Sequence, residues 1–125
     1  MMDRAPQPIQ NKRLISFPLA LSSSRQDFYT VPTNFVARLV NIVAVNTHAS
    51  TARALTLEFY DSGTTTYFNI AAGESLAAKT RLLIEGAEAP LIAMESGDKI
   101  SGSQDTGTDV HCIVTIEEIG ARNSG

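Results

Sequence analysis

Residues 36–46 read V-A-R-L-V-N-I-V-A-V-N, the strongest strand pattern in the sequence. Its apolar side chains recur at alternate positions, as they do along an extended strand. One face takes Val36, Val40, Ile42 and Ala44, and the other takes Leu39, Val43 and Val45. Because both faces are apolar, the pattern predicts a β-strand that is covered on both sides.

The next segment predicts a hairpin. Residues 53–61 alternate between a polar face and an apolar face that carries Leu55, Leu57 and Phe59. The turn-forming residues 61–63, Asp-Ser-Gly, follow, and an extended pattern resumes over residues 65–70. Two such runs joined by a short polar turn are typical of paired antiparallel strands.

Shorter strands are predicted around this centre. Residues 76–85 fit a helix or a strand, but Leu82-Leu83-Ile84 favours a buried strand. Residues 14–21 fit an edge strand, since Pro18 has no N–H to donate to a central ladder. Other short strands are expected at 28–31, 91–94, 99–101 and 110–119. The fold class is therefore all-β: an antiparallel β-sandwich or jelly roll of about eight short strands with an extended N-terminal arm.

Three regions are expected along the 125 residues: an arm at 1–27 that can include the edge strand, a sandwich at 28–119 and a tail at 120–125. Charge differs between the parts. Residues 1–25 carry +3, with Asp3 set against four basic residues, whereas residues 26–125 carry −6. A basic arm on an acidic body indicates that the arm meets another molecule, although a solvated tail explains the same charges.

Composition excludes several classes of function. The net charge of −3 argues against a nucleic-acid-binding protein, and the longest apolar runs are too short to cross a membrane. The single cysteine, Cys112, cannot form a disulfide within the chain. It shares a strand face with Val110, Val114 and Ile116, which predicts a buried core thiol, and the neighbouring His111 points the other way.

No motif for catalysis or for a cofactor stands out. Asp105-Thr106-Gly107 spells the tripeptide of retroviral-type aspartic proteases, but its surroundings fit a tight loop better. Gln104, Asp105 and Asp109 offer oxygen atoms to a cation without the spacing of a calcium loop. We therefore expect neither an enzyme nor a bound cofactor or metal.

A sugar-binding module is the main alternative from another class, because many such modules are β-sandwiches. Sugar sites usually present exposed aromatic rings for stacking. This chain has no tryptophan, and its tyrosines, Tyr29, Tyr60 and Tyr67, fall within predicted strands. Packing of these rings within the domain is favoured over a sugar site.

An ordered series of short motifs covers residues 28–119. Tyr29-Thr30-Val31-Pro32 opens it, the long strand ends in Val45-Asn46, and a threonine-rich hairpin leads to Ala72-Gly73-Glu74-Ser75-Leu76. Leu91-Ile92, Gly97-Asp98-Lys99-Ile100 and the closing Val114-Thr115-Ile116-Glu117 complete it. In this order of features the chain resembles small phage virion structural proteins of β-sandwich or jelly-roll type. Residues 1–27 have no counterpart in that pattern.

The resemblance implies a function exerted by contact. It favours a capsid decoration or cement subunit, with a neck, tail or fibre-base component as the alternative. The expected partners are copies of the chain itself, with a trimer first, and another virion structural protein, foremost the major capsid protein. The expected location is the virion, after synthesis in the host cytoplasm. The residues expected to bind the partner lie in the arm: Arg4, Ile9, Lys12, Arg13, Leu14, Ile15 and Phe17.

Overall fold

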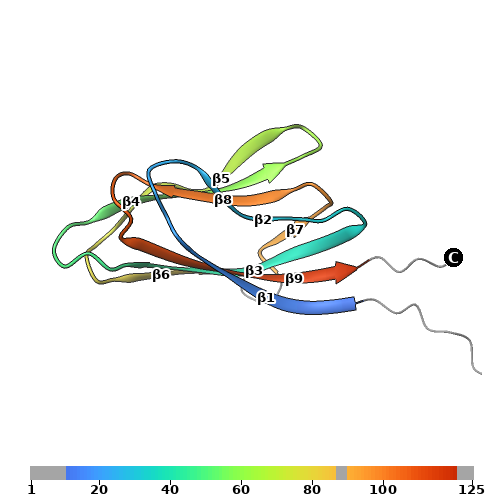
Figure 1. Cartoon of the computed structure of the whole chain (residues 1–125), viewed down its shortest axis with the longest axis horizontal. Coiled ribbons are helices and arrows are strands. Elements are labelled where there is room, and N and C mark those ends of the chain that lie inside the picture. Colours follow the sequence, from blue (N-terminus) through green and yellow to red (C-terminus); the bar gives the residue numbers. More distant parts are fainter. Residues whose placement is uncertain (1–10, 87–89, 121–125) are drawn as a thin grey trace, which may run out of the picture.

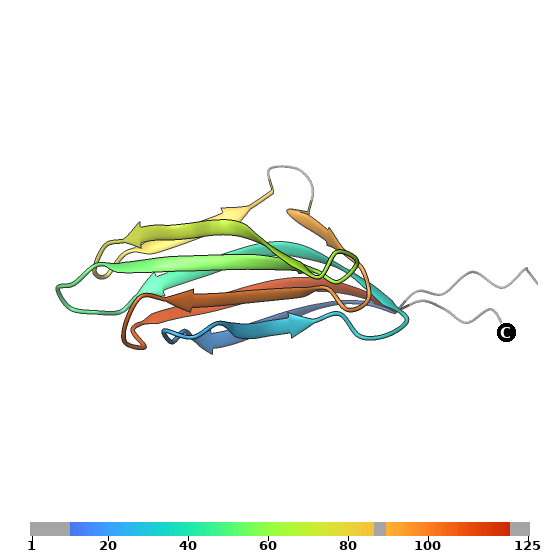
Figure 2. The same ribbon diagram turned by 90° about the horizontal axis from the view of Figure 1, so that it is seen from above.

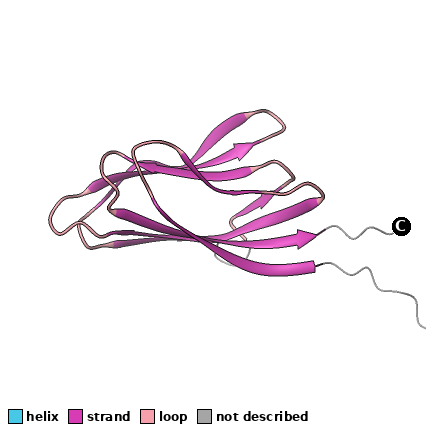
Figure 3. Ribbon diagram, viewed as in Figure 1, coloured by secondary structure: helices cyan, strands magenta, loops and turns pink. Residues whose placement is uncertain are grey.

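The computed structural model describes residues 11–86 and 90–120, and all regular structure in these residues is β-strand (Figure 3). The strands are β1 (Asn11–Ala20), β2 (Gln26–Thr30), β3 (Phe35–Asn46), β4 (Arg53–Asp61), β5 (Thr66–Leu76), β6 (Arg81–Glu85), β7 (Ile92–Met94), β8 (Lys99–Gln104) and β9 (Val110–Gly120). Within this part of the chain, a search for helices able to span a membrane finds none.

The strands form two antiparallel sheets that pack face to face (Figure 1). Sheet A has the order β1-β9-β3-β6, and β7 also pairs with β3; sheet B has the order β2-β8-β4-β5. The predicted all-β antiparallel sandwich is confirmed, with nine strands where about eight were expected. β1 begins and β9 ends at the same corner of sheet A, where Asn11 is opposite Gly120 (Figure 2).

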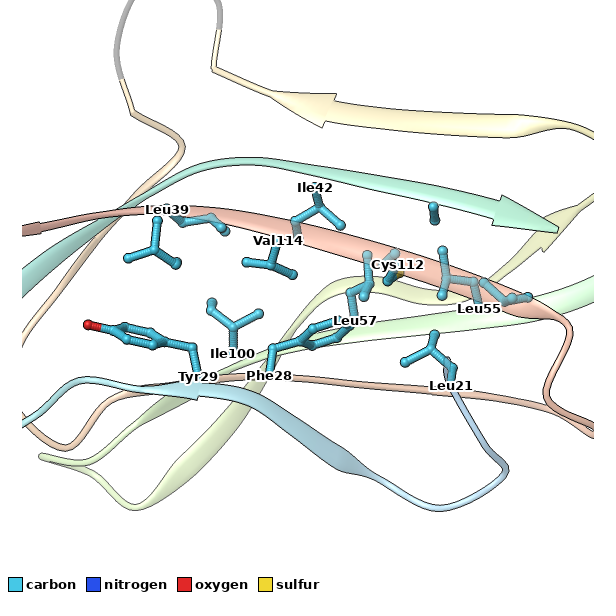
Figure 4. Packing of buried hydrophobic residues seen from close by; sticks show 14 of the residues in the cluster. Leu21, Phe28, Tyr29, Leu39, Ile42, Leu55, Leu57, Ile100, Cys112 and Val114 are labelled. Carbon is cyan, nitrogen blue, oxygen red and sulfur yellow. The ribbon is translucent and has the colours of Figure 1, made fainter. Parts of the chain in front are cut away.

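The core lies between the inner faces of the sheets (Figure 4). Sheet A contributes Leu39 and Ile42 from β3 and alternate residues of β9 from Val110 to Ile116, and sheet B contributes Leu55 and Leu57 from β4 and Ile100 from β8. The predicted inner face of β9 is confirmed, because Val110, Cys112, Val114 and Ile116 are all fully buried.

β3 differs from the sequence-based assignment of its faces. The pairing of β3 with β9 shifts between Leu39 and Asn41, so one extra residue is accommodated there. Leu39 therefore shares the inner face with Ile42 and Ala44, whereas Val36 is 46% exposed. The prediction that both faces of this strand are covered was wrong as well, since Val43 and Val45 on the outer face are only half-buried.

β6 is also exposed more than the sequence suggested. It pairs with β3 at the edge of sheet A, and the Leu83 side chain on it is 50% exposed. Leu82 and Ile84 are half-buried and pack against the core. Leu82 and Leu83 therefore point to opposite sides of an edge strand, one toward the core and the other toward solvent. The prediction that Leu82-Leu83-Ile84 is a buried strand was wrong.

The sandwich includes part of the expected arm. β1 is hydrogen-bonded along its length to β9, from Asn11 opposite Gly120 to Ala20 opposite His111. Residues 11–20 are thus an edge strand of sheet A, and Leu21 is fully buried in the core. The sandwich extends N-terminal to residue 28, because β9 offers a full-length edge for β1 to pair with.

The buried thiol of Cys112 should react slowly in the native protein. Burial raises the pKa of this thiol to about 12, which suppresses the reactive thiolate at neutral pH. A thiol-specific reagent should therefore label the denatured protein quickly and the native protein slowly, and Cys112→Ala should cost about 1 kcal/mol of stability. Rapid labelling of the native protein would show that the inner face of β9 is assigned incorrectly.

Candidate interaction surface

The predicted partner-binding residues fall into three groups: those outside the described residues, those that pack or bind within the sandwich, and those on the outer face of sheet A. Arg4 and Ile9 lie outside the described residues. Ile15 and Phe17 point toward the sandwich from β1, where they are half-buried opposite Ile116 and Val114. The Phe17 ring lies 5.1 Å from the ring of Tyr29 in β2, so it joins the two sheets at this edge.

Arg13 also binds within its own domain. Its Nε and Nη2 atoms donate to Oε1 of Glu118 at 3.1 and 3.0 Å, and the hydroxyl of Tyr29 donates to Oε2 at 2.7 Å. Glu118 is only 3% exposed, so these donors stabilise a buried carboxylate. Burial and the bond to Glu118 raise the pKa of Tyr29 above its ordinary value.

Half of the basic residues near the N-terminus therefore bind carboxylates of their own sandwich. Arg25 makes a two-bond contact with the Glu58 carboxylate at 2.8 and 3.0 Å. Arg13 and Arg25 thus account for two of the four basic residues counted before residue 26. Lys12 and Leu14 of β1 lie on the outer face of sheet A, where Leu14 is 68% exposed.

An apolar row crosses the outer face of sheet A. The strand register places Pro18 of β1 opposite Ile113 of β9, Ile113 opposite Val43 of β3, and Val43 opposite Leu83 of β6. We call these four residues the outer row. Ile113 and Leu83 are 44% and 50% exposed, and no described strand or loop lies beneath sheet A in Figure 1.

The two rows beside the outer row carry most of the polar side chains near it. One neighbouring row consists of Ala20, His111, Val45 and Arg81, and the other of Ser16, Thr115, Asn41 and Glu85. An open hollow lies at the β1 end, lined by Pro18, Leu19, Ala20, His111, Cys112 and Ile113. An apolar strip with a polar border is typical of a surface that contacts another protein.

Sequence reasoning missed the outer row. Its members lie in four strands, and only the register brings them together. The available signal was the apolar character of both faces in residues 36–46, which was interpreted as complete burial. Once one face is assigned to the core, the remaining valines mark the outer surface.

The tyrosines of sheet B pack with cations. The rings of Tyr60 and Tyr67 lie 4.7 Å apart, with the Arg25 guanidinium 3.6 Å from the Tyr67 centroid and Lys99 Nζ 5.3 Å from the Tyr60 centroid. Tyr29 is buried. A sugar ring stacking on Tyr67 would have to compete with Arg25 for the ring face, so this geometry does not favour the sugar-binding alternative.

The Asp105-Thr106-Gly107 segment forms the loop between β8 and β9. Gln104 closes it, since its Oε1 accepts from the Val110 N–H at 2.8 Å and its Nε2 donates to the Thr106 carbonyl at 2.5 Å. Asp105 is exposed, and Asp109 is bound by Arg53 at 2.8 Å. In residues 11–86 and 90–120, no three His, Cys, Asp or Glu side chains are grouped as metal ligands would be.

Replacing Asp105 by asparagine should leave the fold and its stability within about 0.5 kcal/mol of the wild type, because the carboxylate is at the surface. Its backbone N–H, which donates to the Ala54 carbonyl at 3.0 Å, is retained in the variant. Thermal unfolding checks this, with a peptidase assay beside it. Peptidase activity in the wild type that disappears in the variant would show that the segment is catalytic.

Comparison with known proteins finds similar folds but no similar sequences. No protein-family model and no curated protein matches the sequence. A chain from the Bacillus endospore appendages, which are disulfide-linked pili, superposes with a TM-score of 0.54 at 9% identity, over 98% of this chain and 97% of that one. At that identity, the match shows a shared fold and nothing further.

Two other matches are weaker. A chain of the T13 IBDV viral particle gives a TM-score of 0.49 at 10% identity, and this protein covers 31% of its length. A chain with the CBM22-1–GH10 modules of Clostridium thermocellum xylanase 10B gives a TM-score of 0.34 at 12% identity, and this protein covers 27% of its length. Neither is close enough to carry an argument. The fold of this chain is therefore a β-sandwich of a kind that also occurs in an appendage protein.

Proposed function

We propose that this protein is a structural subunit of a phage virion, and specifically a capsid decoration or cement subunit. It acts by contact with neighbouring proteins and not by catalysis. The observation that carries the proposal is the outer row, an exposed apolar strip across β1, β9, β3 and β6, four of the five strands of sheet A. The resemblance of residues 28–119 to small phage virion proteins is the reason for proposing a phage particle.

A contact at the outer row is favourable because apolar surface exposed to water raises the free energy of the protein. Burying apolar area contributes roughly 25 cal/mol per Å², and the outer row gains nothing from the core of its own sandwich. A partner that covers the row recovers this free energy. Its polar border can remain hydrated, as at the rim of many protein interfaces. The expected partners are copies of the chain and another virion structural protein, the major capsid protein first.

Electron microscopy with an antibody against the purified protein tests the proposal. The antibody should label purified phage particles of the source host evenly over the capsid shell. Label confined to one vertex, the tail or the fibre bases would overturn the decoration role and assign the neck, tail or fibre-base alternative. Particles without label, beside a control antibody that binds the major capsid protein, would contradict a virion function altogether.

Arg4 and Ile9 remain proposed partner contacts, and a deletion can separate them from β1. Removing residues 1–10 keeps every described strand, so the sandwich should fold while occupancy on the particle falls. Removing residues 1–13 also takes Arg13 from the buried Glu118, so this variant should unfold at a lower temperature than the first. Unchanged occupancy after the shorter deletion would exclude these two residues from the contact.

A further inference from the structure

A second copy of this chain fits the outer row. We propose that two copies pack with the outer faces of their A sheets together, related by a two-fold axis that runs along the row. This pairing rests on the proposed function, under which the outer face of sheet A contacts other subunits.

Charge on β6 selects the orientation. Arg81 and Glu85 are both exposed and lie two residues to either side of Leu83, so all three side chains point outward from the same strand. None of the ion pairs among the described residues involves Arg81 or Glu85. One positive and one negative charge therefore stand at equal distances from the apolar row.

A two-fold axis along the row reverses the strand direction in the second copy. Arg81 of each copy then lies opposite Glu85 of the other, and Leu83 lies opposite Leu83. Within the flanking rows, Val45 comes opposite Asn41 and His111 opposite Thr115, so no like charges meet. An axis parallel to the strands would instead place Arg81 opposite Ala20 and leave both charges without partners.

One other pair of opposite charges on this face is already matched within the chain. Glu117 of β9 lies 3.7 Å from Arg38 of β3, so neither would be buried alone. Exposed ion pairs contribute little energy, whereas apolar contact contributes most of it. The Arg81–Glu85 pairs thus fix the orientation of the two copies, and the outer row holds them together.

The sheet edges are less suited to joining two copies. Pro18 removes a hydrogen-bond donor from β1, and β6 and β7 are only five and three residues long. β5 contains Gly73 with a φ of 62° and irregular pairing with β4. Short or interrupted edge strands hinder pairing between molecules, so the face of sheet A is the better contact.

The contact is small, which predicts a weak pair. Four strands and three rows cover about 20 by 20 Å at the usual strand spacing and rise. That footprint is roughly half of the 800 Å² per partner of a standard interface. We expect dissociation constants between about 10 µM and 1 mM, so the contact forms fully only where copies are concentrated, as on a particle.

Sedimentation equilibrium of the purified protein up to about 1 mM tests the inference. The wild type should shift from the 13.4 kDa monomer toward twice that mass as its concentration rises. Arg81→Glu and Glu85→Arg should each weaken association roughly tenfold or more, because like charges then face each other. The double variant carrying both changes should restore association to within about threefold of the wild type, since each pair is re-formed with its signs exchanged.

Phe68→Ser is the matched control, because Phe68 is 52% exposed on sheet B and lies outside the contact. It should associate like the wild type. A wild type that stays monomeric, a trimer, or a double variant that fails to recover would overturn the two-fold pair. The assay contains no particle, so its failure is distinct from a failure to label virions.

Discussion

Leu57→Ala should lower the free energy of unfolding by about 2–5 kcal/mol, because it removes a fully buried side chain from the centre of the sandwich. The surroundings of Leu57 are closely packed. A Cβ atom added to Gly102 on the neighbouring strand would lie 3.1 Å from Leu57 Cδ2 and 3.0 Å from Phe28 Cε2. Strands held at this spacing by their ladder cannot close over the space left by the missing leucine, so a cavity remains.

Urea unfolding followed by circular dichroism measures this loss, and Leu14→Ala is its matched control. Leu14 is also a leucine within a strand, but 68% of it is exposed, so its replacement should change stability by no more than about 0.5 kcal/mol. Equal losses in the two variants would contradict the assignment of the inner and outer faces.

Stability should fall steeply in alkaline solution. The Cys112 thiol has an ordinary pKa of 9.0, and burial raises it to about 12 in the folded protein. Between these values the unfolded chain loses the thiol proton while the folded chain keeps it. Since the folded state then binds more protons, its stability decreases as the pH rises, by about 1.4 kcal/mol per pH unit from this group alone.

The buried Tyr29 hydroxyl acts in the same direction. Its pKa is raised from an ordinary 10.0 by burial and by the bond to Glu118, so its contribution is complete below pH 10 and is lost above it. Unfolding measured in urea from pH 8 to pH 11 should show the decline. Cys112→Ala should flatten the curve between pH 9 and 11 although its stability at neutral pH is lower. Parallel curves for the two proteins would contradict the burial of the thiol.

Alternation of apolar residues was enough to predict the class of fold and the face of β9. Val110, Cys112, Val114 and Ile116 keep one parity without interruption, so their burial followed directly from the period of two. β3 was harder, because the irregular pairing between Leu39 and Asn41 exchanges its two faces halfway along. A bulge of this kind depends on the partner strand, and the sequence of β3 by itself has no mark of it.

The ion-pair partners of the basic residues near the N-terminus could not be predicted from the sequence either. Arg13 and Arg25 were counted as part of a basic segment available to a partner, yet they bind Glu118 and Glu58 of their own sandwich. The partners are separated from them by 105 and 33 residues. Only the fold brings such residues together, so a count of charges along the chain could not reveal the pairing.

The candidate surface was hidden for a related reason. Leu83 was assigned to a buried strand, since a run of three apolar residues gives no indication of whether its strand lies at the centre or the edge of a sheet. In the structure its strand is an edge of sheet A, and its side chain aligns with Val43 and Ile113. The outer row is thus a property of topology and register.

A map of the virion by electron cryomicroscopy, at a resolution that traces side chains, would show whether the outer row is an interface on the capsid. We expect nine-stranded sandwiches repeated over the capsid shell, each with the outer row of sheet A covered by a neighbouring subunit. A particle that lacks this chain, or one in which Leu83 and Ile113 face solvent in every copy, would contradict it.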